Sequence, residues 1–426
     1  MNTKASAYLT MAVLCLSVCS TRSLMAQKPQ SFNTTPNYTA IGIDKSRLAR
    51  IDSLLQQQID KGILPHAVTF VAKNGQVIHN KAFGFKDVES RTVIQKDDIF
   101  RMYSQTKAIV TVALMTLFEE GKFQLDDPVK NYIPEMTDLV VDKINPDGSY
   151  TTRKAVSPVT IRQLLSHSSG IGSGKGSDTF REDRQGKEPF STLKDYVTEL
   201  VKYPLAYDPG TNFNYHPAAD VTGYLVELFS GEPLNVYIKK KLLDPMGIKD
   251  MGYYFEGNQA RRLVTIYTER EGKLSPMKMW SGQQDPNIGN KMTYFQGGTG
   301  LYGTIEGYAR FCQMIANGGT FNGTRILGRR TIEMMSQDQL AHPNSGGKDF
   351  CYGLGFQVYP EKRSEGRDIS NFTPMVSTGS LTWGGMANTD YLIDPKEGLI
   401  ILLYTNRTPD TKIWEKFLNT VYQTLE

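Results

Sequence analysis

The sequence predicts an α/β (α+β) fold in which both ends of the chain contribute to one sheet region. Strand-like segments occur before residue 125 and after residue 295, whereas residues 126 to 294 combine short helical segments with loops rich in Gly, Pro and Asp. Long amphipathic segments accompany the strands and are expected to cover the sheet. We therefore expect one unit over residues 27 to 426. Its sheet region covers about 40 to 125 and 295 to 426, and a mostly helical region covers about 126 to 294, with the active-site cleft at their junction.

The first sheet-forming part begins with a helix and a hairpin. Apolar residues recur with helical spacing over 46 to 61. Strand-like runs over 67 to 72 and 77 to 83 flank Asn74-Gly75, a dipeptide typical of a hairpin turn. The strongest helical pattern extends from about Ser104 to Glu120 and ends at Gly121. This helix is so apolar that we expect it to be buried along its whole length.

The remaining elements follow from the same periodicities. The expected helices cover 161 to 166, 193 to 202, 218 to 230, 233 to 242, 303 to 317 and 409 to 425. The expected strands cover 352 to 359, 389 to 394 and 398 to 404. Two loops, 171 to 192 and 256 to 296, are expected to border the cleft and to influence specificity.

Residues 1 to 26 have the composition of a secretory signal peptide. Lys4 and Arg22 are their only charged residues, and an apolar run extends from Leu9 to Cys19. We expect cleavage after Ala26 and export to the periplasm or the medium. Lipid anchoring at Cys19 is the less favoured alternative, because Val18 is bulkier than the small residue that a lipobox has before its cysteine.

Composition and charge favour a small-molecule partner. The 426 residues carry 48 basic and 44 acidic side chains, a formal charge of +4 that is spread along the chain. Nucleic-acid binding needs a concentrated basic face, so it is not expected.

After residue 26 no apolar stretch reaches the roughly 18 residues of a membrane span. The five histidines include no pair with metal-ligand spacing, and no metal or organic cofactor is expected. Cys312 and Cys351 are interpreted as packing residues, although the sequence leaves a bridge between them open.

The first candidate catalytic pair is Ser104 and Lys107, in Ser104-Gln105-Thr106-Lys107. Residues three apart share a helix face, so the two side chains are expected to be neighbours. The simpler interpretation is a serine N-cap followed by a surface lysine. A cation in the first turn, however, opposes the helix dipole. An apolar helix and that dipole both favour a neutral lysine, which can act as the base for a serine nucleophile.

Two further segments carry polar groups suited to catalysis. Tyr215 lies in a turn before the helix that starts at 218, and a phenol beside an ammonium group can take part in proton transfer. In Trp383-Gly384-Gly385-Met386 the paired glycines allow a substrate to approach the backbone, whose N–H groups can bind an oxyanion. A packing tyrosine and a strand-end turn are the simpler alternatives. The segments 164 to 170 and 297 to 301 are interpreted as structural.

Taken in order, these motifs resemble the serine hydrolases related to class C β-lactamases, especially family VIII carboxylesterases. The resemblance covers the chain from the Asn74-Gly75 hairpin to Asp394-Pro395. It implies a β-lactamase/transpeptidase-like fold, an antiparallel sheet flanked by helices. It also implies that Ser104 is the acylated nucleophile, Lys107 its base and Tyr215 an acid and base. The backbone of Met386 would then be the second oxyanion donor beside that of Ser104.

Two departures from the family pattern bear on the substrate. Pro217 stands where β-lactamases have the Asn of Y-x-N, and Trp383-Gly384-Gly385 stands where they usually have K-T-G. The amide and the cation that would bind a β-lactam are therefore missing, and an apolar Trp383 suits an ester with an uncharged acyl group. A competing placement of the third motif is Ser377-Thr378-Gly379, six residues earlier. The leading hypothesis is an esterase; the alternatives are a β-lactamase or D,D-peptidase, and a non-catalytic envelope binding protein.

Overall fold

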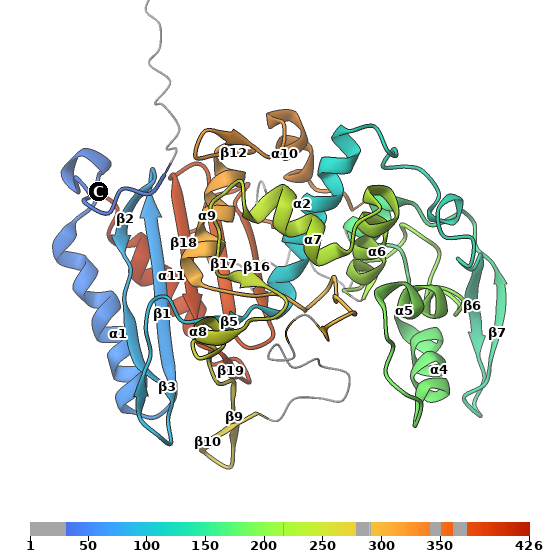
Figure 1. The fold of residues 1–426 in the computed structure, drawn as a ribbon, viewed down its shortest axis with the longest axis horizontal. Helices are drawn as coiled ribbons and strands as arrows, with labels where there is room; N and C mark the ends of the chain where they lie inside the picture. Colours follow the sequence, from blue (N-terminus) through green and yellow to red (C-terminus); the bar gives the residue numbers. More distant parts are fainter. Residues whose placement is uncertain (1–30, 216, 278–288, 290, 341–350, 361–372) are drawn as a thin grey trace, which may run out of the picture.

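A computed structural model describes residues 31 to 426 except 216, 278 to 288, 290, 341 to 350 and 361 to 372. The proposed signal peptide and part of the expected loop 256 to 296 lie outside the described residues. Helices cover both faces of a large sheet, and a second, mostly helical region lies beside it (Figure 1). The expected mixture of helices and an antiparallel sheet is confirmed.

The large sheet has nine strands, in the order β14-β15-β16-β17-β18-β1-β3-β4 with β2 also paired to β1. All its pairings are antiparallel, and one of the two longest joins the two ends of the chain, with Val68 opposite Tyr404 and Lys73 opposite Leu399. The strands are β1 His66–Lys73, β2 Gln76–His79, β3 Ala82–Asp87, β4 Thr92–Val93, β14 Cys351–Tyr352, β15 Gln357–Val358, β16 Leu381–Gly385, β17 Thr389–Asp394 and β18 Leu399–Tyr404.

Each face of the sheet has its own apolar layer, because successive residues of a strand point to opposite sides. Helices α1 (Ala49–Asp60) and α11 (Ile413–Tyr422) pack on the face that presents Val71, Leu392 and Ile401. Helices α2 (Thr106–Glu119) and α9 (Ile305–Ala316) pack against the other face. All but the last two residues of α2 are buried, as its apolar sequence predicts.

The region between the two sheet-forming parts contains most of the remaining helices. They are α3 Ile161–Leu165, α4 Gly174–Arg184, α5 Leu193–Leu200, α6 Ala218–Ser230, α7 Leu234–Ile238 and α8 Gly257–Ala260, and a π-helical turn, Lys239–Leu243, extends α7. The prediction of little strand here was wrong in part: β6 (Leu139–Ile144) and β7 (Tyr150–Lys154) form a hairpin. The strands β9 (Tyr267–Arg270) and β10 (Lys273–Pro276) form another. Both hairpins are largely exposed, with Val140 and Tyr267 as their buried residues, and neither has the regular apolar alternation that marks a half-buried strand.

Three local expectations also need correction. The run 77 to 83 is divided between β2 and β3, with a register shift in the pairing of β1 with β2. The run 352 to 359 is a hairpin of β14 and β15 and not one strand, because glycines interrupt it. The expected loop 171 to 192 contains helix α4. The Asn74-Gly75 turn is confirmed, with φ of 49° and 74°.

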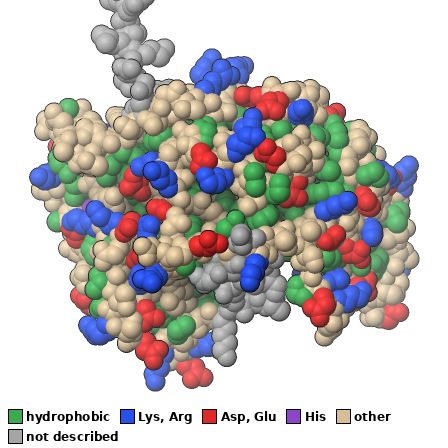
Figure 2. Space-filling view, viewed as in Figure 1, with side chains coloured by type: hydrophobic (Ala, Val, Ile, Leu, Met, Phe, Trp, Pro, Cys, Tyr) green, Lys and Arg blue, Asp and Glu red, His purple; other side chains and the backbone are tan. Residues whose placement is uncertain are grey.

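The shorter elements complete the described chain. They are α10 Arg329–Met335, β5 Phe100–Arg101, β8 Met251–Gly252, β11 Tyr302–Gly303, β12 Thr320–Phe321, β13 Thr324–Arg325 and β19 Arg407–Thr408. Cys312 and Cys351 are both buried, and no disulfide joins these two described cysteines. Every helix within the described ranges is too short or too polar to cross a lipid bilayer. Basic and acidic side chains are interspersed over the described part of the face in Figure 2.

Candidate active site

Ser104 lies in a tight turn between the sheet and the buried helix α2. The turn is a 3₁₀ segment, Tyr103–Gln105, that runs directly into α2. Tyr103 has a φ of 46°, a left-handed conformation that is costly for a non-glycine residue. Its side chain is buried, and the Met102 N–H donates to the Leu301 carbonyl at 3.0 Å. The surrounding packing therefore holds a strained turn that presents Ser104 to a pocket.

Lys107 extends from the first turn of α2 to Ser104. Its Nζ lies 3.2 Å from Ser104 Oγ and donates to the Gly298 carbonyl at 2.9 Å. Only 6% of Lys107 is exposed. The chemistry of serine acylation needs a base within hydrogen-bond reach of the nucleophile, and this geometry provides one.

Tyr215 packs over Lys107 and hydrogen-bonds to Trp383. The Lys107 Nζ lies 4.6 Å from the centroid of the Tyr215 ring. The Trp383 indole N–H donates to the Tyr215 hydroxyl at 2.9 Å, and the two rings lie 4.7 Å apart. The phenol oxygen accepts this bond, which leaves its own O–H available to a different acceptor.

Strand β16 brings Trp383-Gly384-Gly385 beside the serine turn. A Cβ on Gly385 would lie 2.4 Å from the Met102 carbonyl oxygen and 2.2 Å from Thr389 Oγ1, so only glycine allows this close approach. Met386 follows the strand, and its side chain is exposed. Ser377 to Gly379 instead form a turn before β16, where the Gly379 N–H donates to the Tyr359 carbonyl at 2.8 Å.

One pocket of about 450 Å³ brings together most of the candidate residues. Lys107 lies beneath this pocket, at the base of the serine turn. The predicted site residues that line it come from the first, middle and last thirds of the chain: Ser104, Tyr215, Trp383, Gly384, Gly385 and Met386.

Sequence reasoning missed two groups of this site. The segment 297 to 301, which it interpreted as structural, contributes the Gly298 carbonyl that binds Lys107. Asp220, on the first turn of α6, is buried and accepts from the Gly298 N–H at 3.3 Å. Burial raises the pKa of Asp220 to about 6, while the charge of Lys107 and the backbone N–H groups of Gly298 and Gly297 act to lower it. An acidic residue in a first helical turn is ordinary, so only its burial beside Lys107 could have identified Asp220.

The raised pKa of Asp220 predicts a pH-dependent stability difference. Between about pH 4 and pH 6 the folded protein retains the Asp220 proton and the unfolded chain has lost it. The contribution of Asp220 to the free energy of unfolding therefore falls as the pH rises through this range, by on the order of 3 kcal/mol. Asp220→Asn is expected to gain stability relative to wild type between about pH 4 and pH 7 in urea unfolding.

The exposed carboxylate of Asp60 provides the matched control for this experiment. Asp60→Asn is expected to leave both the pH dependence of stability and the activity unchanged. A stability difference between wild type and Asp220→Asn that stays constant with pH would contradict the assignment.

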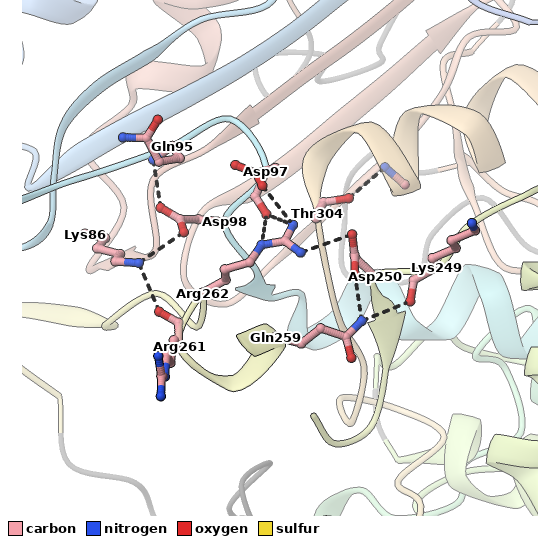
Figure 3. A network of polar contacts seen from close by, with 11 residues as sticks. Lys86, Gln95, Asp97, Asp98, Lys249, Asp250, Gln259, Arg261, Arg262 and Thr304 are labelled. Atoms are coloured by element: carbon pink, nitrogen blue, oxygen red, sulfur yellow. Dashed lines mark hydrogen bonds and ion pairs between the residues drawn. The ribbon is translucent and has the colours of Figure 1, made fainter. Parts of the chain in front are cut away.

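A second pocket, of about 610 Å³, shares no lining residue with the Ser104 pocket. Several of its lining side chains belong to a polar network that extends beyond the pocket lining (Figure 3). Arg262 forms ion pairs with Asp97 and Asp250 at 3.4 and 3.2 Å, and Lys86 pairs with Asp98 at 3.2 Å. This network connects loops that are distant in sequence, and we interpret it as structural. Within the described ranges no three His, Cys, Asp or Glu side chains are grouped to hold a metal ion.

Comparisons with known proteins identify the family of the chain. The family model described as Beta-lactamase matches residues 51–416. The chain is 29% identical to Esterase EstB of Burkholderia gladioli over 86% of this chain and 93% of that protein. It is 27% identical to Lovastatin esterase of Penicillium rubens over 82% and 90% of the two chains. The structure of "EstCE1, a hydrolase with promiscuous acyltransferase activity" aligns with a TM-score of 0.72 at 25% identity, covering 89% of this chain and 99% of that one. The resemblance inferred from the motifs is thus confirmed, and the chain belongs to the β-lactamase family of serine hydrolases.

Proposed function

We propose that this protein hydrolyses carboxylic esters through an acyl-enzyme on Ser104. The observation that carries the proposal is the 3.2 Å contact between Lys107 Nζ and Ser104 Oγ at the base of a pocket. The similarity of this chain to two esterases over most of its length supports an ester substrate. The substrate class is a small-molecule ester.

The first half-reaction forms the acyl-enzyme. Lys107 takes the hydroxyl proton as Ser104 Oγ attacks the ester carbonyl carbon. The backbone N–H groups of Ser104 and Met386 bind the oxyanion of the tetrahedral intermediate. The ester C–O bond then breaks, and the leaving alcohol takes a proton from Tyr215, which recovers one from Lys107.

The second half-reaction releases the acid. A water molecule gives a proton to the Lys107 and Tyr215 pair and attacks the acyl carbonyl carbon. The bond from the acyl carbon to Ser104 Oγ breaks, and the proton returns to Ser104. In both half-reactions the protons move through Lys107 and Tyr215. The scheme therefore uses no cofactor.

A comparison of substrates tests the ester proposal against the β-lactam and peptide alternatives. The pocket that contains Ser104 is also lined by Asp390 and Glu415. If the carboxylate of a β-lactam or of a peptide C-terminus lay beside Glu415, the two like charges would repel each other, and like charges in contact cost several kcal/mol. We expect kcat/KM for a short-chain nitrophenyl ester to exceed that for a chromogenic cephalosporin by more than about 100-fold.

The reverse order of these two rates would favour the β-lactamase or D,D-peptidase alternative. Failure to turn over either substrate, together with failure to react with a fluorophosphonate probe, would favour a non-catalytic binding protein.

We also propose that the enzyme is exported. The charge distribution and the apolar run of residues 1 to 26 support a signal peptide. Cleavage after Ala26 removes Lys4 and Arg22 and lowers the formal charge from +4 to +2. N-terminal sequencing of protein recovered from the periplasm and the medium tests this: Gln27 is expected as the first residue, whereas a lipid-modified Cys19 would indicate anchoring.

A further inference from the structure

One wall of the Ser104 pocket contains two carboxyl groups. Asp390 belongs to β17 and lies opposite Gly384 of β16, and Glu415 belongs to the first turn of α11. The Asp390 carboxylate lies over Gly384, because a Cβ at that glycine would be 2.2 Å from Asp390 Oδ1. This wall is therefore continuous with the strand that borders Ser104.

Among the described residues, the charged groups that act on Asp390 are carboxylates. Burial raises the pKa of Asp390 well above its usual range, and the neighbouring carboxylates of Asp410 and Glu415 raise it further. A carboxyl group in this situation keeps its proton unless a positive group compensates the charge of the ionised form, so a bound cation would favour the Asp390 carboxylate.

Glu415 is also incompletely compensated. Its Oε2 is buried and has no hydrogen-bond partner among the described residues. Among the described residues Glu415 pairs with Lys412, whose Nζ lies 3.9 Å from Glu415 Oε1 and 3.0 Å from Asp410 Oδ2. The side chains of Lys412 and Glu415 are 74% and 47% exposed, so solvent weakens this ion pair. The second carboxylate oxygen of Glu415, on the pocket wall, has no hydrogen-bond partner in the described part of the chain.

Aromatic rings complete the same wall. Trp383, Trp414 and Tyr359 all line the pocket. The face of an aromatic ring attracts a cation, and it attracts a poorly hydrated organic ammonium group most effectively. Carboxylates and aromatic rings together favour an organic ammonium over an anion, and also over a strongly hydrated metal ion.

We propose that the wall formed by Asp390, Glu415, Trp383, Trp414 and Tyr359 binds an ammonium group in the alcohol part of the ester. This inference rests on the proposed function, because it assigns the substrate class of the same site. The alcohol part is chosen because Tyr215, the proposed proton donor to the leaving alcohol, is hydrogen-bonded to Trp383 of this wall at 2.9 Å. The enzyme would therefore prefer esters of amino alcohols with an uncharged acyl group.

A pair of isosteric substrates tests the proposal. Acetylthiocholine and S-(3,3-dimethylbutyl) thioacetate have the same shape and differ in one positive charge. We expect kcat/KM to be about tenfold higher for the charged thioester in wild type. Equal rates, or a faster reaction of the neutral thioester, would overturn the proposal.

Carboxamide variants locate the effect in this wall. Asp390→Asn and Glu415→Gln are each expected to lower the charged-to-neutral ratio, and the double variant to bring it near one. Urea unfolding of each variant reports that it folds. Glu182→Gln, an exposed carboxylate on α4, is the matched control and should retain the wild-type ratio. A wild-type ratio in the double variant would overturn the assignment to these residues.

A binding measurement separates this inference from the ester proposal. Benzyltrimethylammonium should quench tryptophan fluorescence in Ser104→Ala, which cannot form an acyl-enzyme, and this quenching should be lost when Asp390→Asn and Glu415→Gln are added. Quenching without hydrolysis of any ester would defeat the ester proposal alone. Hydrolysis of neutral esters without saturable quenching would defeat the cation site alone.

Discussion

Replacing Ser104 with alanine is expected to lower kcat for a nitrophenyl ester by about a thousandfold or more. The change removes the one atom that would form the bond to the acyl group, and loss of a nucleophile is among the largest single-residue effects in serine hydrolases. Intact-protein mass spectrometry after reaction with a fluorophosphonate probe should show one adduct in wild type and none in Ser104→Ala.

The variant should fold, because it deletes only an oxygen that lies at a pocket and contacts Lys107. Ser53→Ala, on the exposed side of α1, is the matched control and should keep both the adduct and the activity. Full labelling of Ser104→Ala at another serine would show that the nucleophile has been misassigned.

Replacing Lys107 with methionine is expected to lower kcat by about 10² to 10⁴-fold, the range for loss of a general base. Methionine fills the space of the buried lysine stem but cannot take a proton from Ser104. It also leaves the Gly298 carbonyl without its 2.9 Å donor and Asp220 without a cation. We therefore expect a loss of stability of about 1 to 3 kcal/mol in addition to the loss of rate.

The two effects can be separated by measurement. Rates should be taken at a temperature where urea unfolding shows the variant fully folded, and Lys122→Met, an exposed lysine after α2, provides the control. If the role of Lys107 is that of a base, the reaction rate with the fluorophosphonate probe should fall together with kcat. Unchanged probe reactivity in folded Lys107→Met would contradict that role.

The sequence predicts the large elements well where one physical signal dominates. The buried helix that starts near Ser104 is apolar on all sides, and the Asn74-Gly75 turn requires backbone angles that these two residues adopt readily. The short exposed strands were harder to predict from the sequence. The hairpin of β6 and β7 is mostly exposed, and β6 does not alternate regularly between apolar and polar residues, so no apolar pattern marked its strands in the sequence.

The candidate site also contains residues that the sequence predicts and residues that it does not. Ser104 and Lys107 are three residues apart on one helix, and helical geometry alone makes them neighbours. The contribution of Asp220 could not be found in this way, because its effect depends on burial against Gly298 and Lys107 from other segments. Asp390 and Glu415 were missed for a related reason: a carboxylate on a strand and another on a helix have no sequence spacing that marks a pocket.

The sequence by itself determined the family and predicted the candidate pair Ser104 and Lys107, because both depend on short motifs whose residues are local in the chain. The tertiary structure alone decided which distant groups surround that pair. Antiparallel pairing of β1 with β18 joins residues more than 300 positions apart, and it brings the W-G-G strand next to the serine turn. Burial then determines which carboxyl groups face the pocket without a cation. Charge balance in a cavity is a property of three-dimensional neighbours, and for this protein it is the feature from which we infer the substrate class.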